Sequence, residues 1–512
     1  MSERVDVAIV GGGHNALVAA TYLARAGLKT VVLERLPQVG GAAVSVQAFE
    51  GVPARLSRYS YLIALFPEEL ISELGLELDL LSRATASYTP YGSGGLLVET
   101  GLAGETRKSF RALTGSDSEF DAWQAFYSEV STVAKAIVPT LLQPLPHIGD
   151  LRDQVEMAIW TDLVDEPIGK AIERRFANDI VRGIVATDSL IGTFTSANAT
   201  SLIQNRCLLY HLMGNGTGEW RVPAGGMGAL TSELERVAIA AGAELRTNAE
   251  VNRVIARDNG VTVAGDGFSI EADRLLSGVA PWVLAGLLGE SLPVKPQGAQ
   301  LKINLLVDRL PALKSGVDPA IAFAGTLHVD ESYEQLETAH AEAAAGRVPS
   351  TIPGEIYCHT LTDPSILSAE LQSSGTHTLT YFGLHTPPEV FAAPGSKELA
   401  LSRAMHGLNA YLAEPIESVL AKDADGNPCI EAKTPLDIEE ALGMPGGNIF
   451  HGDLSWPWLE EDEHPHDPAH RWGVATNHAR ILVCGSGARR GGAVSGIAGH
   501  NAAHALLAII GI

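Results

Sequence analysis

The sequence predicts an α/β protein with a Rossmann-like domain that is discontinuous along the chain, a second α+β domain and a helical subregion. Three observations predict this fold class. Residues 5–34 read as strand, glycine turn, helix and strand. Strand signals return in 220–290, and a strand, a glycine loop and a helix follow at 481–510. The 512 residues also exceed the ~250–300 at which a single hydrophobic core stops growing.

The N-terminal unit is the clearest local signal. Residues 5–10 are a short β-branched run bounded by glycine, which is typical of a buried parallel strand. The apolar face of the segment after the glycines predicts a helix, and Gly27 suits its C-terminal cap. Residues 29–34 predict the second strand, which completes one βαβ unit.

The remaining elements define the expected domains. Helix-like stretches at 118–137, 154–163 and 166–182 indicate a helical region within 66–219. Residues 300–308 and 376–383 look like strands of a second sheet. The chain therefore divides into an expected nucleotide-binding domain (1–65, 220–290 and 440–512) and an expected substrate-binding domain (66–219 and 291–439).

A dinucleotide fingerprint lies between the first strand and the first helix. Gly11, Gly13 and Ala16 fit G-x-G-x-x-[GA], which combines a tight turn, close backbone approach to a pyrophosphate and tight helix packing. The free amides of the helix N-terminus favour phosphate. Glu34 ends the second strand, where a carboxylate can accept from ribose hydroxyls. The flanking strands and this acid make the fingerprint specific.

The glycines favour FAD over a nicotinamide cofactor. Gly40 and Gly41 suit a loop that follows the pyrophosphate and ribitol of FAD. No second G-x-G-x-x-G follows a strand, so one nucleotide site is expected. The glycine clusters at 484–496 look like a strand, loop and helix N-terminus that close over the flavin ring.

Composition excludes several classes of function. Lys and Arg number 36 against 60 Asp and Glu, and the net charge of −24 repels nucleic acid. The four cysteines form no C-x-x-C pair, which excludes a redox dithiol. The apolar runs are too short to span a bilayer, although a local apolar patch could still contact one. We expect a cytoplasmic protein, with no integral membrane segment and with oligomerisation left open.

Long segments of the chain resemble the phytoene desaturase superfamily. Within it, they are most similar to the branch named pyridine nucleotide-disulfide oxidoreductase domain-containing protein 2, a name whose disulfide chemistry the cysteines exclude. The resemblance implies FAD in a Rossmann-like fold and a second domain that encloses an apolar, small-molecule substrate. The segments that carry it are 11–44, SRYSYL at 57–62, DSLIGTFTSAN at 188–198, GEWRVPAGGMGAL at 218–230, KINLLVDRLP at 302–311, TPLDIEEALGMPGGNIFHGDLS at 434–455 and CGSGARRGGAVSGIAGHNAA at 484–503.

The resemblance also implies cofactor contacts. The N-terminal residues would bind the ADP half of FAD, Val251 would meet the adenine through its backbone, and the C-terminal residues would lie at the ribitol and isoalloxazine. The expected contacts are Gly11, Gly13, His14, Asn15, Ala16, Glu34, Arg35, Gly40, Gly41, Ala42, Val251, Gly485, Ser486, Val494 and Ser495.

Two departures from the branch pattern indicate a local change of specificity. Ala488, Arg489 and Arg490 stand where the branch usually has Thr-His-Pro, and His500 stands where an arginine is commoner. A flavin-facing arginine pair would bind an anion, whereas a surface pair would only offset acidic neighbours. The candidate pocket residues are Arg58, Tyr61, His451, Arg489, Arg490 and His500.

The sequence leaves the chemistry to the cofactor. No Ser-His-Asp grouping, H-E-x-x-H or P-loop lysine is present. The acidic run 460–463 with His464, His466 and His470 lacks ligand spacing, so no metal site is predicted. We expect a phytoene dehydrogenase-like, FAD-dependent desaturase or dehydrogenase in which a hydrophobic or conjugated substrate passes hydride to flavin N5. The alternatives are an amine or alcohol oxidase using O₂, and a flavin-binding regulatory protein without turnover.

Overall fold

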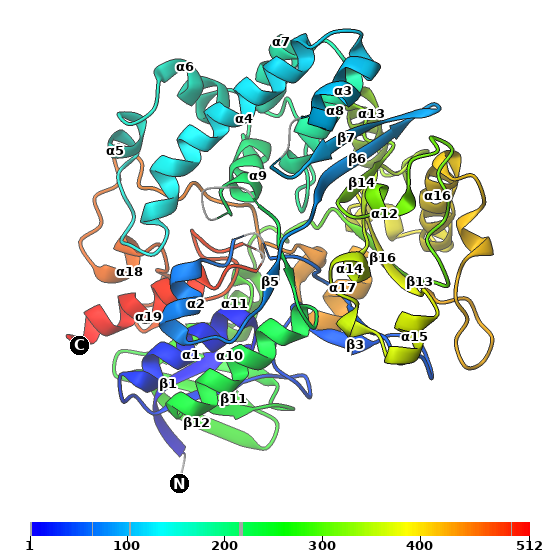
Figure 1. The fold of residues 1–512 in the computed structure, drawn as a ribbon. Helices are drawn as coiled ribbons and strands as arrows, with labels where there is room; N and C mark the ends of the chain where they lie inside the picture. Colours follow the sequence, from blue (N-terminus) through cyan, green and yellow to red (C-terminus); the bar gives the residue numbers. More distant parts are fainter. Residues whose placement is uncertain (1–2, 64, 102–103, 215–218, 493) are drawn as a thin grey trace.

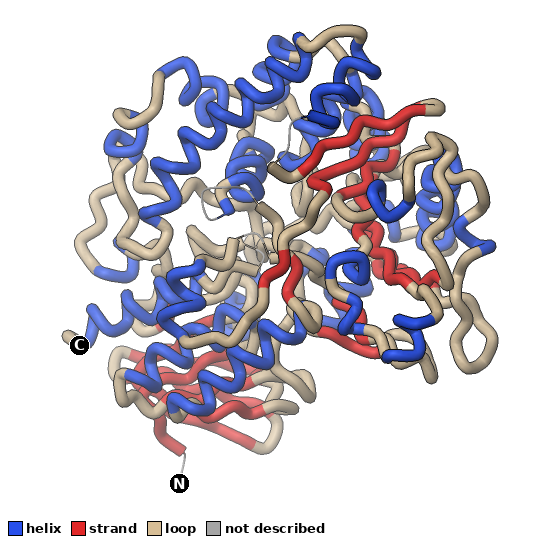
Figure 2. Tube along the Cα trace, viewed as in Figure 1, coloured by secondary structure: helices blue, strands red, loops and turns tan. Residues whose placement is uncertain are grey.

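Two seven-stranded sheets organise the molecule. The computed structural model describes residues 3–63, 65–101, 104–214, 219–492 and 494–512. The first sheet lies beside the N-terminus and is covered by helices, and the second lies on the other side of the molecule, with a layer of helices next to it (Figures 1 and 2). The predicted α/β class is confirmed.

The first sheet is a parallel core extended by an antiparallel meander. Its order is β10-β11-β12-β1-β2-β9, and β18 pairs with the second half of β12. β1 runs parallel to both β2 and β12, with Val7 opposite Thr30 and Arg274. The strands are β1 (Glu3–Val10), β2 (Thr30–Leu33), β9 (Glu244–Arg246), β10 (Val251–Arg257), β11 (Gly260–Gly265), β12 (Phe268–Ser277) and β18 (Ile481–Val483).

Helices from distant parts of the sequence pack together beside this sheet. The last helix contacts the first, and the helix that begins at Met227 lies on the other side of the first (Figure 1). Ser57 and Ser45 accept hydrogen bonds from the amides of Met227 and Gly228, at 3.0 and 2.9 Å, and so cap that N-terminus. The helices are α1 (His14–Arg25), α2 (Glu68–Leu74), α10 (Met227–Ala241), α11 (Pro281–Leu288), α18 (Pro468–Arg471) and α19 (Ile497–Ile510).

The second sheet has the order β17-β13-β16-β15-β14-β6-β7. Its centre is covered on both faces, because all seven residues of β13 are buried. The strands are β6 (Thr85–Tyr91), β7 (Gly94–Glu99), β13 (Leu301–Val307), β14 (Thr326–Val329), β15 (Gly354–Tyr357), β16 (His377–Gly383) and β17 (Ile430–Lys433), and the helices near them are α12 (Pro319–Ala322), α13 (Tyr333–Ala344), α14 (His359–Thr362), α15 (Ala369–Ser373), α16 (Ser396–Tyr411) and α17 (Pro435–Leu442).

The predicted helical region is real but interrupted. The hairpin of β6 and β7 lies inside 66–219 and joins the second sheet. The helix expected over 166–182 is broken, since the Asn178 side chain accepts from the amides of Ile180 and Val181 and starts a new helix. The helices are α3 (Gly104–Thr114), α4 (Ser118–Ile137), α5 (Ile148–Arg152), α6 (Met157–Trp160), α7 (Ile168–Arg175), α8 (Asp179–Ala186) and α9 (Ile203–Leu212).

Two short strand pairs connect these parts. β3 (Ser45–Gln47) pairs with β4 (Arg55–Ser57), and β5 (Leu80–Leu81) pairs with β8 (Val222–Pro223). First-sheet strands come from 3–33, 244–277 and 481–483, and second-sheet strands from 85–99 and 301–433. The expected domain boundaries stay a prediction. Among the described helices, none is both long and apolar enough to cross a bilayer.

Candidate functional site

One cavity of about 390 Å³ extends from the β1–α1 turn to the second sheet. The turns after β1, β2 and β12 form one end of the cavity, which we call the nucleotide end because it contains the predicted fingerprint. Residues from the β4–α2 loop, α9 and β16 form the other end, which we call the far end. The lining residues are 10–16, 33–35, 41–42, 59–62, 65, 191, 210–211, 220, 249–251, 278–280, 283, 287, 300, 382, 442–444, 449, 451, 485–486 and 494.

The glycine turn leaves space where a ligand would lie. Gly11 has φ +88°, its amide donates to Leu33 O at 2.9 Å, and an added Cβ would come within 3.0 Å of Val279. An added Cβ on Gly13, in contrast, meets no atom within 4 Å. Gly13 is the N-cap of α1, and the first-turn amides of a helix have no partner within the helix. This end of the cavity therefore suits a phosphate group.

Glu34 holds the turn from the opposite strand. The Gly12 amide donates to Oε2 of Glu34 at 2.7 Å, and the Leu36 amide donates to Oε1 at 2.8 Å. The side chain is buried and lines the cavity. Each carboxylate oxygen can accept more than one hydrogen bond, so Glu34 keeps capacity for a ligand hydroxyl.

The end of the chain returns to this turn. A Cβ on Gly499 would lie 1.9 Å from Asn15 O, so α19 and α1 touch backbone to backbone near their N-termini. A Cβ on Gly485 would lie 2.5 Å from Gly278 O, which brings the loop after β18 against the loop after β12. The first and last segments of the chain therefore form one wall of the cavity, as expected from the sequence.

Polar atoms without partners face this space. Asn15 Oδ1, Gln300 Nε2 and His451 Nδ1 belong to cavity-lining residues, and each is buried without a hydrogen-bond partner among the described residues. Such atoms are rare in a folded protein unless a ligand or water satisfies them. Burial lowers the pKa of His451 to about 4, so its imidazole is neutral at neutral pH. The donors and acceptors fit a polar cofactor such as FAD.

The far end of the cavity is aromatic. The Tyr61 ring lies 4.4 Å from Phe382 and 4.0 Å from Tyr357, measured between centroids. Tyr210 and Trp220 lie on either side of His211, at 5.2 and 5.8 Å. Of these rings, Tyr61, Phe382, Tyr210, Trp220 and His211 line the cavity. Among the described lining residues the only carboxylates are Glu34 and Glu250, and both lie at the nucleotide end.

Thirteen of the fifteen expected cofactor contacts line the cavity; Gly40 and Ser495 do not. The Gly40 amide donates to Gly12 O at 2.8 Å and so supports the turn, and Ser495 is fully buried just before α19. Of the pocket candidates, Tyr61 and His451 line the cavity.

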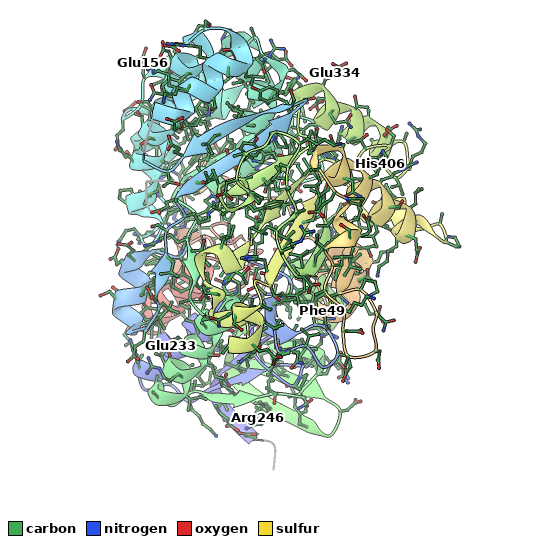
Figure 3. The ribbon with its side chains drawn as sticks, turned by 45° about the vertical axis from the view of Figure 1, so that its right-hand side comes forward. Phe49, Glu156, Glu233, Arg246, Glu334 and His406 are labelled. Carbon is green, nitrogen blue, oxygen red and sulfur yellow. The ribbon has the colours of Figure 1, made fainter. Side chains whose placement is uncertain are left out.

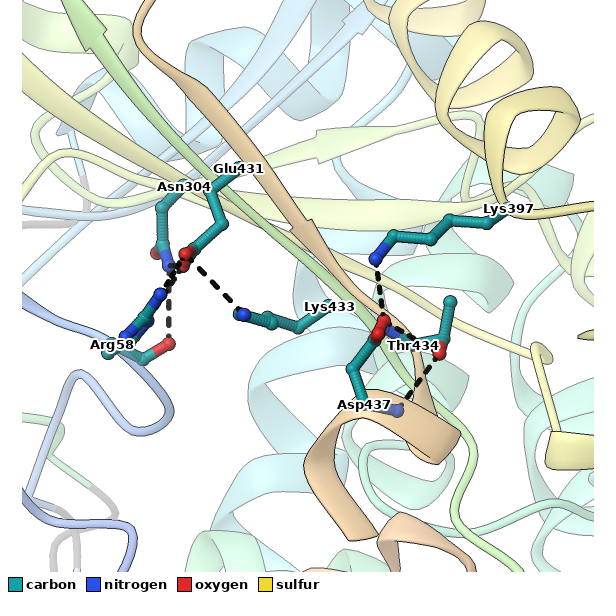
Figure 4. A network of polar contacts seen from close by, with 7 residues as sticks. All are labelled: Arg58, Asn304, Lys397, Glu431, Lys433, Thr434 and Asp437. Atoms are coloured by element: carbon teal, nitrogen blue, oxygen red, sulfur yellow. Dashed lines mark hydrogen bonds and ion pairs between the residues drawn. The ribbon is translucent and has the colours of Figure 1, made fainter. Parts of the chain in front are cut away.

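Arg58 is held away from the cavity by an ion pair. Its guanidinium binds the Glu431 carboxylate with two hydrogen bonds, and Lys433 lies 3.6 Å from the same carboxylate (Figure 4). Asn304 donates to Arg58 O at 3.2 Å. Burial raises the pKa of Glu431, but Arg58 outweighs it, and the net pKa lies below its ordinary value. The side chain that the sequence placed in the pocket instead joins the β4–α2 loop to β17.

Arg489, Arg490 and His500 also have structural partners outside the cavity. Arg489 forms a two-pronged ion pair with Glu463, at 2.9 and 2.7 Å. Arg490 donates to Thr140 O at 2.6 Å. The His500 ring packs 5.3 Å from Tyr22, and burial lowers its pKa to about 4. These contacts replace the flavin-facing positions expected for the three residues.

Several lining residues were not identified from the sequence, among them Gln300, Trp220 and Phe382. Gln300 precedes β13 and Phe382 lies on β16, and these strands pair with Lys302 opposite Phe382. The sequence predicted both strands, but it did not show how they pair. Without the register of that pairing, the residues that face the cavity could not be identified. All four cysteines are free and buried.

Comparison with known proteins agrees with this geometry. Residues 17–314 match the family described as flavin containing amine oxidoreductase. An uncharacterized protein of Mycobacterium tuberculosis is 51% identical over 99% of this chain and 97% of its own length. Pyridine nucleotide-disulfide oxidoreductase domain-containing protein 2 of Rattus norvegicus is 29% identical over 98% of this chain and 93% of its own. The resemblance predicted from the motifs is confirmed.

The fold is shared with solved structures. Putrescine oxidase bound to putrescine superposes with a TM-score of 0.59 at 17% identity, covering 100% of this chain and 99% of that one. The prediction of FAD is confirmed, because the matched family is flavin-containing and the cavity supplies the turn, the acid and the unpartnered polar atoms that the cofactor requires. The chain is an oxidoreductase that belongs to the flavin containing amine oxidoreductase family.

Proposed function

We propose that this chain is an FAD-dependent dehydrogenase that removes two hydrogens from a carbon–carbon bond of an apolar or conjugated substrate, in the manner of a desaturase. The observation that supports this best is the composition of the far end of the cavity. Tyr61, Tyr210, Trp220 and Phe382 line it, whereas its described lining residues include no carboxylate. An aromatic wall without ionic partners favours an apolar ligand.

The proposed cofactor contacts follow the cavity. The α1 amides and the Gly11–Gly13 turn would hold the pyrophosphate, Glu34 a ribose hydroxyl, and Val251 the adenine. FAD, when bound, would supply the acceptor for the hydride, which carries both electrons, and the second hydrogen would leave as a proton. The full set proposed to bind it is Gly11, Gly13, His14, Asn15, Ala16, Glu34, Arg35, Gly41, Ala42, Val251, Gly485, Ser486 and Val494, with Gly40 and Ser495 shaping the turns beside them.

The chain's own residues would orient the substrate and exclude water. The aromatic side chains offer large rigid surfaces that fix an apolar molecule at little entropic expense. His451 is neutral and its Nδ1 has no partner among the described residues, so it can hydrogen-bond to a bound group without introducing charge. The backbone of His451 has φ +63°, in the left-handed region that residues other than glycine seldom adopt.

Anaerobic mixing tests the proposal. Holoenzyme is mixed with a panel of apolar alkenes and conjugated polyenes, and the flavin absorbance near ~450 nm is followed. We expect at least one such compound to bleach the flavin and to yield a product lighter by two hydrogens. Phe382→Ala should retain its FAD but require more substrate to bleach the flavin. Tyr91→Ala removes an aromatic ring outside the cavity and serves as its control.

Amine oxidation is the second candidate, because the family description names amines and putrescine oxidase shares the fold. Aromatic rings can hold an ammonium group by cation–π attraction. In this case putrescine or a monoamine bleaches the flavin, peroxide forms in air, and the apolar panel has no effect. Full flavin occupancy with no bleaching by either panel would contradict both and favour a protein without turnover.

A further inference from the structure

A second buried polar cluster lies between the second sheet and the helical region. His328 on β14, Glu331 just after β14 and Glu355 on β15 are 5%, 1% and 1% exposed. One ligand atom of each lies within 4.8 Å of the others. None of the three lines the 390 Å³ cavity. The cluster directly precedes α13, whose first turn carries Glu334 (labelled in Figure 3).

A contact at Nδ1 orients the His328 ring. Nδ1 lies 2.8 Å from Thr89 Oγ1 on β6, and Nε2 lies 4.0 Å from Glu331 Oε2. A hydrogen bond from Nδ1–H to the hydroxyl leaves the lone pair of Nε2 directed at the carboxylates. Metal-binding histidines in proteins are commonly fixed in this way by a group behind the ring.

Glu331 lacks the partners that a buried carboxylate needs. Neither of its oxygens accepts a hydrogen bond of ordinary geometry among the described residues, although the Thr187 hydroxyl lies near it and the residue is 1% exposed. Its backbone is also fixed, because a Cβ on Gly183 of α8 would lie 1.8 Å from Glu331 O. An unpaired ion in such surroundings is strongly destabilising, so either a bound cation or a proton must neutralise it.

The surrounding charges do not balance. Glu355 accepts a hydrogen bond from Tyr357, and the positive charge of Arg83 lowers its pKa against the effect of burial. Asp188 interacts electrostatically with Glu331 and Glu355. Asp330 also interacts with Glu331. Four carboxylates and one guanidinium leave a charge of −3 when all are ionised, and a single divalent cation would neutralise two of these charges.

We propose that His328, Glu331 and Glu355 bind a divalent transition-metal cation, for which Zn²⁺ is the matching probe. One imidazole and two carboxylates are ligands that zinc accepts. Bonds of about 2.0–2.2 Å would draw the three atoms slightly closer together. The ion would join β14 to β15 beneath α8, so its role is structural and separate from the cavity.

Metal content and thermal stability test the site in the FAD-loaded protein. Protein purified with Zn²⁺ and dialysed exhaustively should retain about one equivalent by mass spectrometry, and stripping it with a chelator should lower the Tm reversibly. Glu331→Gln should reduce the retained zinc to about a tenth or less, as expected when an anionic ligand is lost. The double variant His466→Ala/His470→Ala removes exposed histidines and should retain the full equivalent.

Protons are the competing means of neutralisation. If Glu331 is simply a protonated acid, Gln is its isostere, the Tm of Glu331→Gln matches that of the wild type, and neither protein retains zinc. That result overturns the proposal. Retention that is lost only in the His466/His470 variant would overturn it as well. If a cluster variant fails to fold, the wild type and the His466/His470 variant together still decide the matter: one retained equivalent in both supports the site, and none in the wild type overturns it.

Discussion

Single residues decide how closely the ends of the chain approach the cofactor. Gly499 is the tightest of these positions, because any side chain there meets the backbone of α1 at Asn15. Sequence inspection marked the helix that contains Gly499 but not this contact, since a helical glycine gives no sign of what lies across from it. The same holds for Arg58, Arg489 and His500, whose partners come from remote segments.

Replacing Gly499 with alanine should separate the two helices. The clash with Asn15 O cannot be relieved by a rotamer change, so we expect a loss of about 1–3 kcal/mol of stability and weaker FAD retention. Gly286→Ala on α11 is the matched control, because its Cβ would meet only Leu292 at 3.7 Å and alanine favours a helix. Chemical denaturation measures the stability of the two variants, and flavin content after dialysis measures their FAD retention. Equal behaviour of the two variants would refute the close contact.

Glu34→Gln tests the acid of the fingerprint. The amides of Gly12 and Leu36 both donate to this carboxylate, and an amide side chain offers only one acceptor oxygen. We expect a loss of about 1.5–3 kcal/mol in FAD binding, which is the value of a hydrogen bond to a charged group. Titration of the flavin-free protein with FAD provides the measurement. An unchanged affinity would mean that Glu34 supports neither the turn nor the ribose.

At the scale of elements, prediction succeeded where the signal is local. The βαβ unit and α19 have glycines at the ends of their helices, and α4 has a long helical periodicity within its own segment. β6 and β7 were missed because residues 66–219 were assigned as a whole to a helical region. Pro90 and the Gly-Ser-Gly turn weaken the strand signal, and only pairing with β14 makes β6 part of a sheet. The α7–α8 break was missed because the Asn178 cap is a short polar signal inside a helical pattern.

The loop after α14 should make the stability of the fold depend on pH in the acidic range. Asp363 is buried, which raises its pKa, but hydrogen bonds from His359, Ser365 and the Gly225 amide outweigh burial and hold the pKa below its ordinary value. A depressed carboxyl pKa stabilises the fold above the unfolded value of about 3.9, and this stabilisation is lost as the pH falls further.

Asp363→Asn should therefore lower the Tm at pH 7, and the difference from the wild type should begin to shrink once the pH falls below about 4. The loss at pH 7 should be about 1–3 kcal/mol, because buried amides lose a charged acceptor. Asp423→Asn is the control, since that carboxylate accepts amides within an exposed turn. Differential scanning calorimetry across this pH range gives the comparison. A Tm difference that grows on acidification would reverse the predicted sign.

At the scale of the whole molecule, the two sheets meet at the cavity. The β1–α1 turn contributes one end and Phe382 of β16 the other, so the aromatic end depends on how the sheets are placed relative to each other. The nucleotide end could be predicted because its residues follow a fixed motif within one βαβ unit. The aromatic end could not, because Tyr61, Trp220, Gln300 and Phe382 come from four separate segments.

This arrangement predicts that the cofactor stabilises both sheets together. A ligand that binds only the folded chain adds about 2.7 kcal/mol at a hundredfold excess over its dissociation constant. FAD added to flavin-free protein should therefore raise the Tm of a single transition, while NAD⁺ at the same concentration should not, because the second glycine pair serves a flavin nucleotide. Circular dichroism follows the first sheet and the second alike, and the difference in fluorescence between the wild type, which has seven tryptophans, and a Trp220→Phe variant reports on the aromatic end. If FAD shifts the circular dichroism transition but leaves the fluorescence transition where it was, the two ends of the cavity do not belong to one binding site.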